Sequence, residues 1–243
     1  MKESLTSPLS YTELRQKYDY HDPSYAFYYK YIKRPIAYPL TYIVYRYTSF
    51  TPNQLTLFGF VCALFAGMSF SQGTATGALI GALLFFLFEC ADDFDGIVAR
   101  AKKMGSKRGA WLDFVNGIWG KLAALIGITL GVYTKTGSIH YLMLGIIAIS
   151  SFLFVSLLDS SIKNYFVNKP QKKLKFAEHV PNAQTLAGKL SILSEMAMNL
   201  SFIAIIFGGL FNRLDVTLYY VSIYFPLYAL AQFGYRFRQY AHL

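Results

Sequence analysis

The sequence GALIGALLFFLFECADDFDGIVA, residues 77–99, decides the fold because it joins a long apolar run to a cluster of carboxylates. About 20 apolar residues are enough to cross the roughly 30 Å of hydrocarbon in a bilayer. An ionised carboxylate at that depth costs at least about 2.5 kcal/mol, so it is expected only where it faces a cavity, a cation or a partner. The stretch therefore predicts a membrane helix that carries a functional site.

Five further apolar runs of similar length predict membrane helices elsewhere in the chain. Of the 243 residues, 54% are hydrophobic and 18% are aromatic. Lipid offers the backbone no hydrogen-bond partner, so a spanning run of this kind has to be helical. We expect an all-α integral membrane protein with six transmembrane helices, at Leu55–Ser71, Gly77–Ala99, Ala110–Val132, Tyr141–Tyr165, Leu186–Leu210 and Leu218–Phe237.

The charge distribution predicts the orientation. Lys and Arg number 23 against 13 Asp and Glu, a formal net charge of +10, which in a soluble protein would raise the question of nucleic acid. Here the basic residues gather before span one, between spans two and three, between spans four and five, and near the C-terminus, whereas the other links carry few charges. The positive-inside rule places both termini and the two basic loops in the cytoplasm. We expect the inner membrane of a bacterium or a eukaryotic endomembrane, and no nucleic-acid partner.

The N-terminal segment, residues 1–50, is expected to be cytoplasmic and to hold an interfacial amphipathic helix, with the six-span membrane domain at residues 51–243. Tyr side chains alternate with Lys and Arg within residues 24–50, a mixture that favours the headgroup layer. We expect this helix to be broken near Pro35 and Pro39. The first 24 residues hold no apolar signal-peptide run, so span one is expected to act as the anchor.

Two local features concern helix starts and thiols. Thr51 is predicted to be the N-cap of span one, with Pro52 in the first turn, where proline is tolerated.

Cys62 and Cys90 fall in separate spans without metal-site or disulfide spacing, so we interpret them as packing residues.

The carboxylates predict a cation site. At 100° per residue, Glu89, Asp92 and Asp95 share one helix face, whereas Asp93 is expected to point elsewhere. Asp113, at the start of span three, returns across a short basic loop. Clustered carboxylates repel unless they are protonated or neutralised, and oxygen-rich sites suit Mg²⁺, Mn²⁺ or Ca²⁺. A hard divalent cation in turn implies a phosphate or pyrophosphate substrate.

These residues resemble the CDP-alcohol phosphotransferase family (CDP-alcohol phosphatidyltransferases), whose signature is D-x2-D-G-x2-A-R-x8-G-x3-D-x3-D. The start of span one is also similar to the P-N-x-x-T pattern at the family's first span, through Pro52, Asn53 and Thr56. Every spacing of the signature is kept up to its fourth aspartate, at Asp92, Asp95, Gly96, Ala99, Arg100, Gly109 and Asp113.

The resemblance implies displacement at a CDP-linked phosphoryl group by an alcohol, with release of CMP and one or two divalent ions, Mg²⁺ or Mn²⁺. It implies that Asp92, Asp95 and Asp113 are the catalytic metal ligands. The expected nucleotide-binding residues are Asn53, Thr56, Gly96, Ala99, Arg100 and Gly109. Lys107 and Arg108 are expected either to hold phosphate oxygens or to mark the cytoplasmic boundary. The expected partners are a CDP-linked lipid or alcohol donor, an acceptor alcohol or phosphate, membrane lipid and a second copy of the chain in a homodimer.

The departure from the family lies at the fourth aspartate, whose position is Gly117. The resemblance implies that this aspartate acts as the general base in the family. Glycine has no side chain that could accept the proton. The neighbouring Asn116 amide is not basic enough to replace it. Glu89, Lys121 and Glu195 remain as outside candidates for the base.

Three interpretations stay open. The acceptor is already anionic and needs no base, or another group acts as the base, or the chain is a catalytically impaired homologue that keeps a metal-nucleotide site as a binding or scaffold subunit. The favoured function is transfer of a substituted phosphoryl group from CDP-diacylglycerol or a related CDP-alcohol in phospholipid or polar-lipid synthesis. A carrier or channel for a phosphorylated metabolite ranks below both, since charges within the membrane also mark transport routes.

Overall fold

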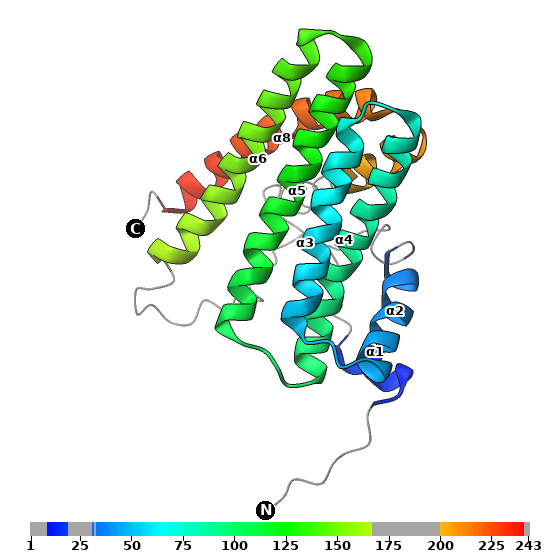
Figure 1. The fold of residues 1–243 in the computed structure, drawn as a ribbon. Coiled ribbons are helices and arrows are strands. Elements are labelled where there is room, and N and C mark those ends of the chain that lie inside the picture. The colour runs from blue at the N-terminus through cyan, green and yellow to red at the C-terminus, as the bar shows by residue number, and fades with distance from the viewer. Residues whose placement is uncertain (1–8, 19–30, 32, 167–199, 241–243) are drawn as a thin grey trace, which may run out of the picture. The chain divides into compact units, whose positions relative to one another are not determined.

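The computed structural model describes residues 9–18, 31, 33–166 and 200–240, and within them every regular element is a helix (Figure 1). This part of the chain confirms the all-α prediction. The helices are α1 (Tyr11–Tyr18), α2 (Arg34–Tyr47), α3 (Pro52–Ser71), α4 (Ala75–Ala101), α5 (Lys107–Thr136), α6 (Ile139–Phe166) and α8 (Leu214–Tyr240), with a further helical stretch at Leu200–Leu210.

Five of the described helices are long and apolar enough to cross a membrane: α3, α4, α5, α6 over Ile139–Leu158, and α8 over Leu214–Gly234. The protein is therefore an integral membrane protein. Residues 186–199 of the remaining expected span, Leu186–Leu210, lie outside the described part of the chain. The count of six transmembrane helices therefore stays a prediction. The observed helices are longer than the apolar runs because polar caps add turns; α5 begins three residues before Ala110, where Gly109 N donates to Ser106 Oγ at 3.0 Å.

The short helix α1 was not anticipated from the sequence, although its start carries a capping signal. Ser10 N donates to Glu13 Oε2 at 2.8 Å, and Glu13 N donates back to Ser10 Oγ at 3.3 Å. These hydrogen bonds hold the pKa of the Glu13 carboxyl below its usual range. Leu14 is fully buried against Tyr38 and Ile97, which fixes α1 on α2 and α4.

Helix α2 corrects one expectation. Pro35 lies in its first turn, as proline prefers, but the helix continues through Pro39 without the expected break. The face formed by Ala37, Tyr38 and Thr41 is buried, and this packing outweighs the missing donor of Pro39. Residues 24–30 and 32 of the expected interfacial helix lie outside the described part of the chain.

The chain forms two compact units, one from residues 1–64 and 84–121 and one from residues 65–83 and 122–243. In the first unit, a Cβ on Gly59 would lie 3.1 Å from Ala91 Cβ, so α3 and α4 pack closely. In the second, a Cβ on Gly67 would lie 2.5 Å from the Ala123 carbonyl oxygen, and α6 packs along α8. Small residues allow these approaches, as is usual between membrane helices. Cys62 and Cys90 are buried free thiols, which confirms them as packing residues.

Candidate functional site

Asp92 and Asp95 of α4 lie near Asp113 of α5 in the first unit. The side chains of Asp92 and Asp113 are close enough to interact directly. The charge of Asp95 interacts with both of them. Asp95 is buried, and Asp92 and Asp113 are half-buried. The structure therefore places Asp113 near the two aspartates of α4, whereas their role as metal ligands stays a prediction.

Helix α3 contributes a hydroxyl to this cluster. Thr56 Oγ1 donates a hydrogen bond to Asp95 Oδ2, and both residues are buried. The start of α3 is held by reciprocal hydrogen bonds, from Gln54 N to Thr51 Oγ1 at 3.3 Å and from Thr51 N to Gln54 Oε1 at 2.9 Å. Thr51 is thus confirmed as the N-cap, and its capping box sets the first turns of the helix that carries Thr56.

Two signature glycines lie beside polar side chains. A Cβ on Gly109 would be 3.1 Å from Asn53 Oδ1, so the missing side chain lets the Asn53 amide lie against the start of α5. A Cβ on Gly96 would be 3.4 Å from a terminal nitrogen of Arg100, whose guanidinium lies along the same face of α4. Residues of the two sequence patterns, at the starts of α3 and α5, are therefore in contact.

The other two carboxylates of α4 form a separate group, which corrects the expectation that Asp93 points away from Glu89. Lys33 Nζ lies 3.1 Å from Asp93 Oδ2 and 3.5 Å from Glu89 Oε2, and its side chain is 5% exposed. Lys121 Nζ lies 4.0 Å from Glu89 Oε1. The pairing of Lys33 with these carboxylates could not be predicted from the sequence, because 56 positions separate Lys33 from Glu89 and no local pattern links them.

The Asn116 amide, beside the missing aspartate, is buried. Asn116 is 3% exposed, and among the described residues neither its Nδ2 nor its Oδ1 has a hydrogen-bond partner. Within the described part of the chain, a Cβ on Gly117 would have no atom within 4 Å. Position 117, where the signature has its fourth aspartate, therefore has open space among these residues. The unsatisfied amide of the preceding residue costs about 1–3 kcal/mol.

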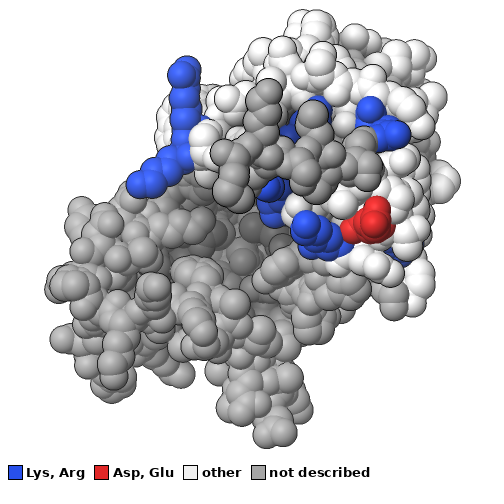
Figure 2. Space-filling view, turned by 90° about the horizontal axis from the view of Figure 1, so that it is seen from below, with Lys and Arg blue, Asp and Glu red and all other residues white. Residues whose placement is uncertain are grey.

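Basic side chains gather at the loop between α4 and α5. On the described part of the face in Figure 2, several Lys and Arg side chains and one group of Asp or Glu atoms are visible. Arg100, Lys107 and Arg108 are exposed. Lys102 Nζ instead donates to the carbonyl oxygens of Thr48 and Phe50, each at 3.1 Å, which ties the loop to the link before α3.

The described residues contain no set of three or more His, Cys, Asp or Glu side chains that is ready to hold a metal as it stands. The candidate metal ligands among them are the three aspartates, and Asp95 already accepts a hydrogen bond from Thr56. Glu195, the outside candidate for the base, lies beyond the described part of the chain.

Comparisons with known proteins agree with the residue pattern. The CDP-alcohol phosphatidyltransferase family matches residues 49–227. A bifunctional IPC transferase and DIPP synthase of Aquifex aeolicus (strain VF5) is 39% identical over 66 residues. That match covers 27% of this chain and spans 14% of the relative's length.

Proposed function

Because the chain belongs to the CDP-alcohol phosphatidyltransferase family, we propose that it transfers a substituted phosphoryl group, such as phosphatidyl, from a CDP-linked donor to an acceptor and releases CMP. The observation that carries this proposal is the meeting of Asp92, Asp95 and Asp113 beside Thr56. We assign the donor as CDP-diacylglycerol or a related CDP-alcohol, and the role as phospholipid or polar-lipid synthesis.

The three aspartates are the proposed ligands of one or two Mg²⁺ or Mn²⁺ ions. Their carboxylate oxygens are the donors that hard divalent cations prefer. Neighbouring carboxylates repel one another unless a proton or a cation neutralises part of their charge, and a divalent ion would do so for Asp92, Asp95 and Asp113. When bound, the ion supplies positive charge to the diphosphate and to the departing CMP.

The surrounding residues are proposed to bind the nucleotide diphosphate. Asn53 and Thr56 present an amide and a hydroxyl, and the short side chains of Gly96, Ala99 and Gly109 let a ligand approach α4 and α5 closely. The exposed cations of Arg100, Lys107 and Arg108 suit phosphate oxygens, since charge-assisted hydrogen bonds are the strongest available to them.

The transfer forms one bond and breaks another. An acceptor oxygen bonds to the phosphorus that carries the substituent, and the bond from this phosphorus to the oxygen of CMP breaks, so that CMP leaves with the electron pair. An alcohol acceptor must also lose a proton. Position 117 offers no base, and Glu89 is held by Lys33 and Lys121. An acceptor that is already anionic, such as a phosphate, removes this requirement.

A second candidate function is a binding or scaffold subunit that keeps the metal-nucleotide site without turnover. The observation that favours it is Gly117, because loss of a general base typically lowers a rate by about 10²–10⁴-fold.

The proposed arrangement in the membrane has both termini and the loop at residues 102–106 in the cytoplasm, with residues 1–50 along the interface. The exposed apolar side chains of α2 support the interfacial position, because Ile36, Leu40, Ile43 and Tyr47 recur every three or four residues and so share one face.

The test is CMP release by the purified full-length protein, given Mg²⁺ or Mn²⁺, labelled CDP-diacylglycerol, and a panel of alcohol and phosphate acceptors. Release that requires both metal and one acceptor class supports the transferase and identifies the acceptor. Retained CDP binding with no release for any acceptor would favour the scaffold instead. Absence of both CDP binding and release rejects both candidates.

A further inference from the structure

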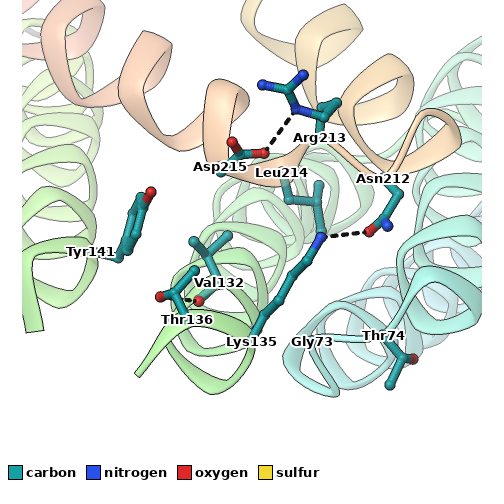
Figure 3. A pocket seen from close by; sticks show the side chains of 11 residues that line it. Gly73, Thr74, Val132, Lys135, Thr136, Tyr141, Asn212, Arg213, Leu214 and Asp215 are labelled. Atoms are coloured by element: carbon teal, nitrogen blue, oxygen red, sulfur yellow. Dashed lines mark hydrogen bonds and ion pairs between the residues drawn. The ribbon is translucent and has the colours of Figure 1, made fainter. Parts of the chain in front are cut away.

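A pocket of about 170 Å³, lined by apolar surface and several polar side chains, lies within the second unit, the one formed by residues 65–83 and 122–243, and shares no lining residue with the candidate site. Its walls come from the link after α3, the last turns of α5, the start of α6 and the turn before α8 (Figure 3). Because these are the ends of membrane-spanning helices, the pocket lies at the level where spans meet the headgroup layer.

The pocket has an excess of positive charge. Its lining includes two cations, Lys135 and Arg213, and one carboxylate, Asp215. Arg213 Nε donates to Asp215 Oδ1 at 3.3 Å, and the terminal guanidinium nitrogens extend beyond that pair (Figure 3). Lys135 Nζ donates to the neutral Asn212 Oδ1 at 3.2 Å, so its charge is not balanced by this partner. An anion bound here would meet the Lys135 ammonium, with the exposed Arg213 side chain at the edge of the pocket.

The sequence makes the meeting of these cations unusual. The links at residues 72–76, 133–140 and 211–217 contain only Lys135 and Arg213 as basic residues. Their positions are 78 residues apart, since 213 minus 135 is 78, yet both line one pocket. Scattered interfacial lysines and arginines would not be expected to converge when so few are present.

Aromatic side chains at the starts of α6 and α8 support the headgroup level. His140 Nε2 and Tyr219 Oη are 3.1 Å apart, and the Tyr141 and Tyr219 rings meet edge to face at 5.7 Å between centroids. Tyr141 itself lines the pocket. Tyrosine is enriched at the boundary between lipid and water, where its ring and its hydroxyl each find a suitable solvent.

The backbone conformation of the link after α3 shapes one wall of the pocket. Gly73 has a φ of +68°, and a Cβ there would lie 2.6 Å from the Gly131 carbonyl oxygen, so only glycine lets the link after α3 lie this close to α5. Asn212 also adopts a positive φ, +54°, which turns its side chain toward Lys135. The lysine is therefore held in place before any ligand arrives.

We propose that this pocket binds the phosphate group of a phospholipid headgroup through Lys135 and Arg213, with the acyl chains left in the surrounding bilayer. The volume accommodates a headgroup and not a whole lipid. Hydrogen bonds between a charged side chain and a phosphate are stronger than those between neutral groups, so the Lys135 ammonium suits an anionic headgroup. The site is independent of the proposed transferase activity, and the same chemistry would also take free phosphate.

The experiment is native mass spectrometry of the full-length protein in detergent, with phosphatidylglycerol, diacylglycerol or inorganic phosphate as the probe. We expect the wild type to retain phosphatidylglycerol and not diacylglycerol, which lacks the phosphate. The double variant Lys135→Gln/Arg213→Gln should retain at least about tenfold less phosphatidylglycerol, because hydrogen bonds to two charged groups are lost. The charge-preserving variant Lys135→Arg/Arg213→Lys should retain more than the double Gln variant.

The matched control is Arg46→Gln/Lys103→Gln, which removes one Arg and one Lys at exposed positions outside the pocket. Equal retention by wild type and the pocket variant, or an equal loss in the control, overturns the proposal. If the pocket variant loses inorganic phosphate but not lipid, the lipid assignment is wrong. Each single Gln variant is measured as well, so that poor folding of the double variant does not remove the test.

Discussion

Lys33 and Asp93 form a buried ion pair, with 3.1 Å between Nζ and Oδ2, and the same ammonium also faces Glu89 at 3.5 Å. This pair divides the carboxylates of α4 into two groups. Glu89 and Asp93 have lysine partners within 4.0 Å, whereas Asp92 and Asp95 interact with Asp113 on α5, and the charge of Lys121 also acts on Asp92. The carboxylates that remain for a cation are therefore those of the family signature.

Replacing Lys33 by Met should destabilise the protein by about 3–5 kcal/mol, because two buried carboxylates would lose their shared cation. The apparent melting temperature of the full-length protein in detergent measures this, and Lys33→Arg should recover most of the loss. The control is Arg213→Gln, since Arg213 is 64% exposed and its pair is expected to contribute about 0–1 kcal/mol. Equal shifts for Lys33→Met and Arg213→Gln would contradict a structural role for the buried pair.

Asp92→Asn and Asp113→Asn should each remove metal-dependent CDP binding and lower any CMP release at least about a hundredfold, the scale of losing one contact to developing charge. Mn²⁺ binding followed by electron paramagnetic resonance gives a readout that does not depend on turnover. The control is Asp93→Asn, a neighbouring carboxylate whose partner is Lys33. Unchanged Mn²⁺ binding in both Asp92→Asn and Asp113→Asn would contradict the assignment of these aspartates as metal ligands.

Gly117→Asp restores the carboxylate at the family position and is expected to raise CMP release with an alcohol acceptor by about 10²–10⁴-fold. The open space around a Cβ at 117 should accommodate the new side chain. Gly117→Asn is the matched control, because it is similar in size but not basic. A fall in activity with a phosphate acceptor, without any gain with alcohols, would show instead that the site suits an anionic acceptor.

Two glycines one turn apart on α5 should respond oppositely to alanine. Gly117→Ala should be neutral or stabilising by about 0.5–1 kcal/mol, because its Cβ meets no atom and glycine weakens a helix. Gly120→Ala should cost about 1–3 kcal/mol, since its Cβ would lie 2.5 Å from Cζ of the fully buried Phe88. Thermal unfolding of both variants in detergent checks the contrast, and a stable Gly120→Ala protein would refute the close packing of α3, α4 and α5 in this unit.

The proposed orientation predicts opposite labelling of two introduced thiols. Lys103→Cys should react with a membrane-impermeant maleimide only after the membrane is opened, whereas Ser138→Cys should react in intact cells or sealed vesicles of cellular orientation. Both positions are exposed, and the native Cys62 and Cys90 are buried, so background labelling should be low. The reverse pattern would invert the topology inferred from charge.

The Asn116 amide is buried without a hydrogen-bond partner among the described residues. Replacing Asn116 by Leu, which is similar in volume, should therefore leave the stability of the protein unchanged or raise it, because the polar group is removed without leaving a cavity. Unfolding without added nucleotide tests this prediction. A loss of CDP binding in the same variant would indicate that the amide is kept for the ligand. Strong destabilisation would mean that Asn116 has a structural partner.

The family could be predicted from the sequence because its signature is local. The spacing from Asp92 to Asp113 lies on two consecutive helices joined by a short loop, so the carboxylates had to return to the same end of the pair. Helix bounds were less accurate, since apolar runs do not include capped polar turns such as Lys107–Gly109. Helix α1 was missed although Ser10 and Glu13 carried its capping pattern.

The sequence by itself determined the apolar helices, the signature aspartates and the loss of the carboxylate at Gly117, because hydrophobic runs and fixed spacings act over short stretches of chain. Only the tertiary structure decided that Lys33 pairs with both Glu89 and Asp93, that the buried Asn116 amide has no hydrogen-bond partner among the described residues, and that Lys135 and Arg213 line one pocket. Ion pairing, desolvation and cavity formation depend on which distant side chains meet, and helix packing sets those meetings.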